Sequence, residues 1–571
     1  MKRGFTWANG LILCTSAAAL SIPLDVRATG LYGDAGEAEL VRPLLIKDAN
    51  LLEEGDGSLS LAATEAMNGG FLPASSADIT TKAIVNAAFD ATAMVASLEP
   101  KTEELVLFGG AEVAASTPPS IVGGRSFQGQ LDATFTPSDS AGAIGTTRYV
   151  QLVNRRFAIY SRTSATPLSS GTLNAFAGVS STVKVFRPQV IWDPTTARFY
   201  YVMNATVSAT NQRLAYGFSK TATPTTAADW CKYVIGGYGS LFPDFPRLGD
   251  TQHFAVVGVN VYNSTSVFQR ADVLAIRKPP AGSTCPTAAS LQVTARQNLK
   301  DTSGNRIFSP TPANQIDTAS DGYIVARNLS LPSNRLWIFK VTRNATTGAA
   351  VIDAVGKALT LPFTTSIPPD ATQGGLTQKI DTGDTRLTQA VLAINPLRGA
   401  TAFSLWTQQT VANNGTSAVR AYEINPVSTT PTLRRTEIIT TPLGFVYNAA
   451  ISSDRRVDGT TKAFGGSVVI AANASSAFLN IPPGIGMGSS VNGSKFYSGA
   501  LVKAAIGPYR DSTCKTAGSI CRWGDSSSAA PDPRPATTGT GAVWFTNQYS
   551  GFANPQTTQA NWRTWIWAAK P

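Results

Sequence analysis

Short apolar segments rich in valine, tyrosine and phenylalanine alternate with turn residues along most of the chain. Runs such as RYVQLVN (148–154), RFYYVMNAT (198–206), HFAVVGVNVY (253–262) and LWIFKVT (336–342) are bounded by Gly, Pro, Asn, Asp or Ser. This pattern predicts short β-strands from about residue 125 to the C-terminus at residue 571. Long helices are not expected in this region.

A segment that carries Asp together with Pro or Gly opens a new group of strands at regular intervals. Four short strands need about 50–75 residues, and repeats of this size are typical of propeller blades. The pattern therefore predicts an all-β fold over residues 125–571, a seven-bladed β-propeller, with six or eight blades as alternatives. The sequence WRTWIWAA (562–569) suits a strand that closes the last blade by pairing with a strand from the start of the domain. The seven opening segments begin at Pro137, Arg187, Phe245, Asn314, Thr382, Asn448 and Arg522.

The first 120 residues differ from this repeating pattern. Two basic residues precede an apolar stretch at 11–24, and Val26-Arg27-Ala28 fits a cleavage site, so residues 1–28 are predicted to be a signal peptide. The expected localisation is secreted or periplasmic. Residues 29–120 contain TTKAIVNAAFDATAMVASL (80–98), which has helical spacing, so this N-terminal extension is expected to be partly helical or disordered. No later stretch has the length and hydropathy of a transmembrane segment.

Export makes the cysteines informative, because secreted proteins form disulfides in an oxidising compartment. Four cysteines follow the predicted signal peptide. Cys514 and Cys521 enclose only six residues and are expected to pair with each other, which leaves Cys231 to pair with Cys285. A metal site through these thiols is disfavoured, because no C-x-x-C occurs and the chain has one histidine.

Three segments place Arg, Gly and Asp together before an apolar run: PRLGDTQHF (246–254), GDTRLTQAV (383–391) and RWGDSSSAAPDP (522–533). The favoured interpretation is structural: they are turns that enter a blade, and each Arg pairs with an Asp of a neighbouring blade. The alternative is a site at one mouth of the central channel, where the arginines bind a carboxylate or sulfate and an Asp acts as acid or base. The candidate residues of that site are Asp250, Asp384, Asp525, Arg247, Arg386 and Arg522.

Composition excludes several other classes of function. The net charge of +11 comes without a long basic run or interleaved aromatic residues, so nucleic-acid binding is not expected. The sequence lacks a P-loop and a G-x-S-x-G motif. His253 is the only histidine; a hydrogen-bonded residue at a strand edge is the favoured interpretation over a catalytic one. No cofactor is expected, with Ca²⁺ in the turns at 381–384 or 525–532 as a minor alternative.

The segments PSDSAGAIGTTRYVQLVN, PQVIWDPTTARFYYV, PRLGDTQHFAVVGVNVY and the terminal RWGDSSSAAPDP with NWRTWIWAA resemble secreted bacterial sialidase-like (BNR-type) β-propeller proteins. The resemblance covers about residues 127–571 and implies the propeller fold. It does not imply the activity, since no full Asp box is present and TASDGYIV (318–325) has the wrong spacing. The Phe-Arg-Ile-Pro motif of true sialidases is matched only by Phe186-Arg187-Pro188, so Arg187 alone is implied as a carboxylate ligand.

The sequence predicts a secreted propeller that binds glycan or cell-envelope components and is non-catalytic or weakly catalytic. A sialidase-like hydrolase or a lyase that uses the Asp and Arg residues is one alternative, and an extracellular scaffold for protein–protein interactions is another. The sequence does not predict the oligomeric state.

Overall fold

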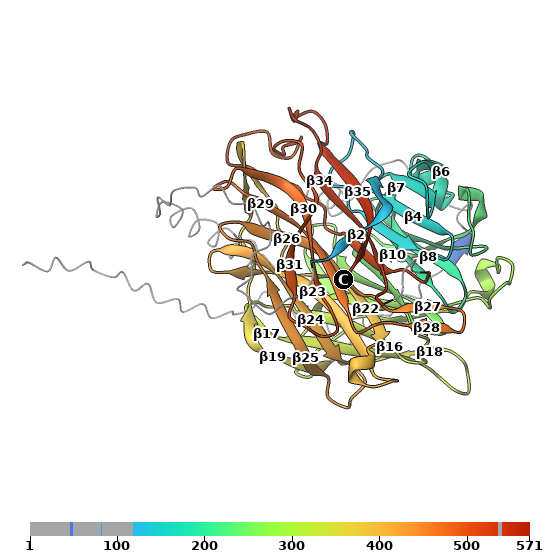
Figure 1. Cartoon of the computed structure of the whole chain (residues 1–571). Helices are drawn as coiled ribbons and strands as arrows, with labels where there is room; N and C mark the ends of the chain where they lie inside the picture. The colour runs from blue at the N-terminus through green and yellow to red at the C-terminus, as the bar shows by residue number, and fades with distance from the viewer. Residues whose placement is uncertain (1–45, 49–81, 83–117, 535–538) are drawn as a thin grey trace, which may run out of the picture. The chain divides into compact units, whose positions relative to one another are not determined.

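The computed structural model describes residues 46–48, 82, 118–534 and 539–571, except the side chains at 46–48 and 497–498 (Figure 1). Regular structure in these residues is almost entirely β-strand. The expected signal peptide and most of the extension at 29–120, including the helix at 80–98 apart from Lys82, lie outside them. Within the extension, β1 (Ile46–Asp48) is a strand and pairs with β10 (Trp230–Gly239).

Most strands belong to four-stranded antiparallel meanders that follow one another along the chain. The first is β3 (Ala141–Ile144), β4 (Arg148–Val153), β5 (Arg156–Ser161) and β6 (Pro167–Thr172). The second is β7 (Lys184–Asp193), β8 (Arg198–Ser208), β9 (Asn211–Ser219) and β10. The third is β11 (Phe242–Asp250), β12 (Phe254–Tyr262), β13 (Phe268–Arg277) and β14 (Val293–Arg296).

The next two meanders are joined in one sheet, because β15 and β22 pair in parallel. One consists of β15 (Ile307–Gln315), β16 (Gly322–Asn328) and β17 (Ser333–Arg343), with both β18 (Ala350–Ile352) and β19 (Lys357–Thr365) paired to β17. The other is β22 (Leu387–Ile394), β23 (Phe403–Asn413), β24 (Thr416–Asn425) and β25 (Thr432–Ile439). A further meander is β26 (Phe445–Ser453), β29 (Val468–Ser476), β30 (Ile481–Ser490) and β31 (Tyr497–Lys503).

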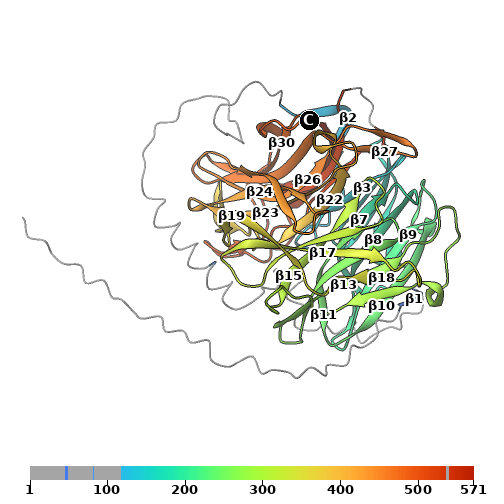
Figure 2. The ribbon, with the colours of Figure 1, turned by 90° about the horizontal axis from the view of Figure 1, so that it is seen from below.

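The last meander combines strands from both ends of the described chain, as the sequence predicted. It runs β33 (Ser528–Pro531), β34 (Val543–Ser550), β35 (Trp562–Lys570) and β2 (Ser120–Gln128). In both views β2 lies beside the C-terminus (Figures 1 and 2), and Phe127 is opposite Ile566 in the pairing. The pairing ties residue 120 to residue 570 and protects the edge of β35.

Hydrophobic side chains fill the spaces between consecutive meanders. One cluster joins the first and second meanders through Phe176 and Tyr201, whose ring centroids lie 4.9 Å apart. Corresponding clusters join each later pair of neighbours. A final cluster joins the last meander to the first, where Tyr149 stacks on Trp544. The core is thus divided into layers between sheets, and these layers form an uninterrupted series.

The first strand of several meanders contains the same irregularity. In β7, β11, β15 and β26 two consecutive residues drop out of the pairing with the next strand, and the first of these two residues has positive φ. A residue with a side chain seldom adopts this conformation, so its recurrence marks a repeated structural feature. Proline follows in three of the four strands, where its missing N–H costs no ladder hydrogen bond. The four residues are Arg187 (φ 52°), Phe245 (φ 53°), Ser309 (φ 59°) and Asn448 (φ 49°).

The remaining elements are short. The strands β20 (Ala371–Gln373), β21 (Leu376–Ile380) and β32 (Ile520–Cys521) form a small sheet, and β27 (Arg456–Asp458) pairs with β28 (Thr461–Ala463). Within residues 118–534 and 539–571, the helices are α3 (Leu173–Ala177) and the 3₁₀ turns η2 (Ala227–Asp229), η3 (Ala288–Ser290) and η4 (Pro396–Arg398). Among the described residues, no helix has the length and apolar character needed to cross a membrane.

Candidate functional site

A network of buried arginines and aspartates lies where the first strands begin. Arg187 on β7 contacts Asp244 on β11 (3.2 Å) and Asp525 ahead of β33 (2.5 Å). Burial alone would lower the pKa of Arg187, but these carboxylates raise it above its ordinary value. Arg187, implied by the resemblance as a ligand for a substrate carboxylate, is therefore bound to carboxylates of the protein itself.

The next two arginines of the network are also paired. The Arg386 Nε lies 3.0 Å from Asp384, and its Nη1 lies 3.7 Å from Asp244. Arg522 contacts Asp381 and lies 2.8 Å from Asp525. The contacts Arg386–Asp244 and Arg522–Asp381 join distant segments, as the structural interpretation expects, whereas the other two contacts lie within one Arg-Gly-Asp segment each.

Parallel pairing between β21 and β32 explains how Asp381 meets Arg522. Ile380 is opposite Cys521, so the residues that follow each strand leave the small sheet side by side. Asp381 also accepts a hydrogen bond from Lys82 (2.7 Å), whose Nζ lies 2.6 Å from Asp370. Burial would raise the pKa of Asp381, but Lys82 and Arg522 hold it below its ordinary value. Both oxygens of this carboxylate are thus occupied by cations.

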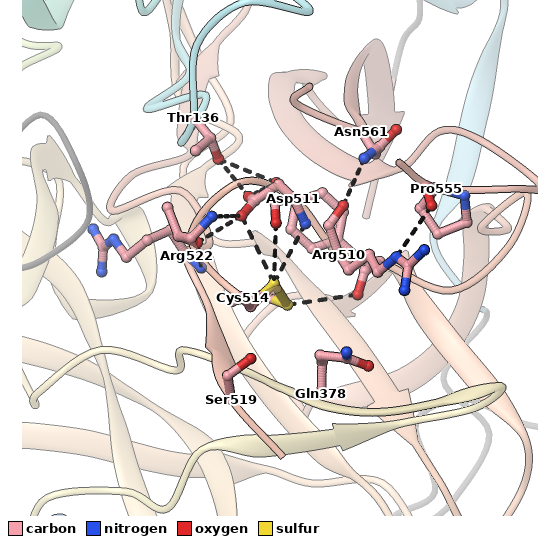
Figure 3. Close-up of a disulfide and its surroundings, with 12 residues drawn as sticks. Thr136, Gln378, Arg510, Asp511, Cys514, Ser519, Arg522, Pro555 and Asn561 are labelled. Carbon is pink, nitrogen blue, oxygen red and sulfur yellow. Dashed lines mark hydrogen bonds between the residues drawn. A yellow bond between two sulfur atoms is a disulfide. The ribbon is translucent and has the colours of Figure 1, made fainter. Parts of the chain in front are cut away.

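The disulfide between Cys514 and Cys521 lies beside this part of the network (Figure 3). Asp511 is held in place just before the disulfide loop. Its carboxylate accepts a hydrogen bond from the Thr136 hydroxyl (2.8 Å), and its backbone N–H donates to the Cys514 sulfur (3.3 Å). The bridge fixes the residue directly before Arg522. The second disulfide joins Cys231 and Cys285, so the structure contains the two disulfides that the sequence predicted.

Asp250 does not join the network, although the sequence pattern grouped it with Asp384 and Asp525. It is the last residue of β11, where Lys278 contacts both Asp250 (2.6 Å) and Asp193 (2.8 Å). Burial raises the pKa of Asp250 to about 6, against the opposing effect of Lys278.

The correct counterparts of Asp250 are the carboxylates that end the other first strands. Each of these residues ends a first strand or follows it within two residues and accepts hydrogen bonds or an ion pair there, whereas Asp384 and Asp525 come before their strands. The three Arg-Gly-Asp segments are therefore not copies of one element. The set at the strand ends is Asp193, Asp250, Asp317, Asp454 and Asp532.

His253 lies at the entry to β12 and is partly buried. Its backbone N–H donates to the Thr251 hydroxyl (3.0 Å), and its ring meets Phe254 edge-on. Partial burial and the charges of Arg343 and Arg277 lower the pKa of His253, so the imidazole is neutral at neutral pH. Its position agrees with the strand-edge interpretation.

Two hollows lie next to the network. The first has a volume of about 20 Å³ and is lined by residues 381–386 together with Thr388, Thr410, Asn448 and residues 523–525. We call it the mouth pocket. The second, also about 20 Å³, lies between the first strands and includes Arg247, Gln189, Thr311 and Ser528 in its wall. We call it the channel cavity; Thr388 lines both hollows.

The turns at 381–384 and 525–532, the minor candidates for a Ca²⁺ site, have their aspartates bound to cations of the protein. No group of three or more His, Cys, Asp or Glu residues with suitable geometry occurs in residues 118–534 and 539–571 or at the other described positions. Asp381 contacts Lys82 and Arg522, and Asp532 contacts Arg162 (2.6 Å).

The sequence analysis overlooked several residues of this site. Asp244, Lys278 and Lys82 carry ion pairs but stand outside any recognised motif. A proline in three of the first strands could have aligned the repeats. It is the third residue of FRPQ, DFPR and FSPT, at positions 188, 246 and 310. Aligning the chain on these prolines groups Arg247 with Gln189 and Thr311, which all line the channel cavity.

Comparisons with known proteins give only distant likenesses to solved structures. No model of a protein family matches the sequence, and no curated protein matches it. A solved variant of the Synechocystis apocarotenoid oxygenase has 10% identity and a TM-score of 0.33, covering 64% of this chain and 72% of that one. An exo-β-1,3-galactanase from Clostridium thermocellum has 11% identity and a TM-score of 0.27, covering 55% and 65%.

A subtype N11 neuraminidase-like protein of A/flat-faced bat/Peru/033/2010 is also similar, with 8% identity and a TM-score of 0.30, covering 67% of this chain and 99% of that one. Likenesses this distant carry no argument about activity. The fold is all-β and propeller-like on the strength of its own strand pairing. Membership of the sialidase-like family stays a prediction from the sequence motifs.

Proposed function

We propose that the chain is a seven-bladed β-propeller whose mouth pocket binds carbohydrate without cleaving it. The blade number rests on contacts among the first strands. In chain order β3, β7, β11, β15, β22, β26 and β33 each contact the next, and β33 contacts β3. A series of seven that returns to its start favours a closed ring of seven blades over six or eight.

The lining of the mouth pocket supports the binding of a polar, uncharged ligand. Thr382, Thr385, Thr410 and Asn448 line it beside the buried Trp523. The Thr382 hydroxyl donates to the Pro369 carbonyl oxygen, and the Asn448 side-chain amide donates to Asn473 and Asn547. Thr385 has φ of 69°, a strained conformation for a β-branched residue, and strain of this kind concentrates at functional sites. Its buried hydroxyl has no hydrogen-bond partner among the described residues. This unsatisfied hydroxyl in a polar pocket is the observation that carries the proposal.

The state of the carboxylates supports binding rather than hydrolysis. Glycosidases commonly need two carboxyl groups that reach the glycosidic bond, one of them as a proton donor. Asp384 and Asp525 are both paired with arginine. Burial raises the pKa of Asp139 and of Asp244, as a proton donor requires, but their exposed fractions are 1% and 0%. A polymer could not reach them without opening the network.

The two disulfides are compatible with an oxidising compartment, so we place this binding function in the periplasm or outside the cell. A glycan or a polymer of the cell envelope is the ligand class that fits this location.

The test is a glycan array probed with the purified chain and with Thr385→Val. Valine keeps the shape of threonine and breaks no hydrogen bond that the structure contains, so the fold should persist while the ligand loses one. We expect binding to a restricted set of glycans and a loss of about tenfold in Thr385→Val. Thr430→Val, at an exposed loop position, is the matched control and should bind like the wild type. A blank array for the wild type would refute the proposal.

A further inference from the structure

Arg247 is a buried cation with no carboxylate partner among the described residues. Its exposed fraction is 2%, and its Nη1 donates one hydrogen bond, to the Thr388 carbonyl oxygen (3.1 Å). Its Nε has no partner within the part of the chain that the structure describes. The guanidinium lies 3.7 Å from the centroid of the Phe245 ring, which supplies weak attraction but no compensating charge.

The surroundings do not remove the charge of Arg247. Burial, followed by repulsion from Arg187, lowers the pKa of Arg247 to about 9. The side chain therefore remains protonated at neutral pH. An uncompensated buried charge costs several kcal/mol, so a stable fold normally brings an opposite charge to it.

The channel cavity provides room for such a charge. Arg247 lies in the wall of this cavity of about 20 Å³, with the polar side chains of Gln189, Thr311 and Ser528 around it. One water-sized occupant needs about 10–15 Å³, so the cavity has room for a single small ion. Among the described residues, no Asp or Glu lines it.

We infer that the channel cavity holds a small monovalent inorganic anion, such as chloride, in contact with the Arg247 guanidinium. Asp139 and Asp525 act on Arg247 from a longer range and raise its pKa, so they also repel anions. A single negative charge meets less of this repulsion than phosphate or sulfate would. The inference goes beyond the carbohydrate site, since it rests on a different cavity and on Arg247, which lines only that cavity; Thr388 is shared by the two hollows.

The first test locates the ion directly. Crystals of the wild-type chain are soaked in sodium bromide, and anomalous scattering from bromide is recorded. We expect a peak in the channel cavity in contact with the Arg247 guanidinium. A well-diffracting crystal with bromide peaks at the protein surface and none at Arg247 would overturn the inference.

The second test measures thermal unfolding as bromide replaces gluconate at constant ionic strength. An anion that binds only the folded chain raises the midpoint, and we expect a rise of about 1–3 °C between roughly 1 and 100 mM bromide. Arg247→Gln should abolish the rise and Arg247→Lys should keep part of it. Arg335→Gln removes an exposed arginine and should respond like the wild type.

An equal bromide response in wild type and Arg247→Gln would contradict the inference, because the effect would then come from elsewhere on the chain. If Arg247→Gln does not fold, the comparison uses Arg247→Lys, and an unchanged response in that variant together with a missing anomalous peak refutes the site. Both tests are independent of glycan binding, so a blank glycan array leaves them unaffected.

Discussion

Lys278 and Arg247 are both buried cations near the first strands, yet their environments are opposite. Lys278 lies between Asp193 and Asp250, which raise its pKa above the ordinary value although burial alone would lower it. Arg247 contacts no carboxylate of the described residues, and burial lowers its pKa. Lys278 therefore holds neighbouring strands together, whereas the charge of Arg247 is left for the proposed anion to compensate.

Two charged residues of one short segment of β11 also lie in different environments. Arg247 and Asp250 stand three residues apart in β11, but Arg247 lines the channel cavity and Asp250 ends the strand at Lys278. In an extended strand, residues three apart point to opposite faces and are separated by about 10 Å. A motif that looks like one catalytic unit in the sequence is therefore split between two sites.

The largest expected effect is that of Lys278→Met. The variant leaves two buried carboxylates facing one another without a cation, so the free energy of unfolding should fall by about 3–5 kcal/mol. Urea unfolding measures it. Lys340→Met removes a lysine from an exposed pair with Asp321 and should cost less than about 1 kcal/mol. Equal losses in the two variants would show that the Lys278 cluster is not a structural ion pair.

Asp525→Asn should have the next largest effect. The change removes the charge that pairs with Arg187 and Arg522, and we expect a loss of about 2–4 kcal/mol in the free energy of unfolding. Asp458→Asn, in an exposed pair with Arg534, is the control. An unchanged unfolding free energy in Asp525→Asn would favour a catalytic carboxylate over a structural one.

Asp250→Asn should change the pH dependence of stability. The pKa of Asp250 is raised to about 6 in the folded chain and is about 3.9 when unfolded. Between these values the folded state binds more protons, so the stability contributed by this group is present below about pH 4 and is lost as the pH rises to about 6. The wild type should lose roughly 2–3 kcal/mol through this group, and Asp250→Asn should not. Parallel unfolding curves for the two proteins from pH 4 to pH 7 would disprove the raised pKa.

The smallest expected effect is that of Arg247→Gln in gluconate buffer without bromide or chloride. Removing Arg247 removes a desolvation cost that no carboxylate of the described residues offsets, together with one hydrogen bond to the Thr388 carbonyl oxygen, so the unfolding free energy should fall by no more than about 1 kcal/mol, and any larger change should be a gain. Urea unfolding beside Lys278→Met gives the comparison. A loss as large as that of Lys278→Met would show that a carboxylate of the protein already compensates Arg247.

Much of the fold follows from the sequence, because strand alternation and turn residues are local properties. The closing strand WRTWIWAA and both disulfides were predicted from such patterns, and the structure contains them. The pairing of Arg187 with Asp244 and Asp525 depends on contacts between residues 57 and 338 positions apart in the chain. From the sequence we could predict only that arginines and aspartates of neighbouring blades would pair, and not which residues would do so.

The site was harder to predict than the fold, because the alignment of the repeats used the wrong residues. Arg, Gly and Asp are common at turns for several unrelated reasons, so their co-occurrence misplaced Asp250. The prolines at 188, 246 and 310 follow a positive-φ residue in a bulge and mark equivalent backbone positions. Prolines at such positions are the better guide to the alignment of diverged repeats, because few residue types are compatible with the backbone geometry of the bulge.

The central claim is that the charged groups of the first strands hold the fold together and leave a pocket that binds without cleaving. The most direct test incubates the glycans selected by the array with the wild-type chain and follows them by mass spectrometry. The account predicts that every bound glycan is recovered intact. Cleaved glycan that forms with the wild type and disappears with Asp525→Asn, at a temperature where that variant is folded, would contradict it.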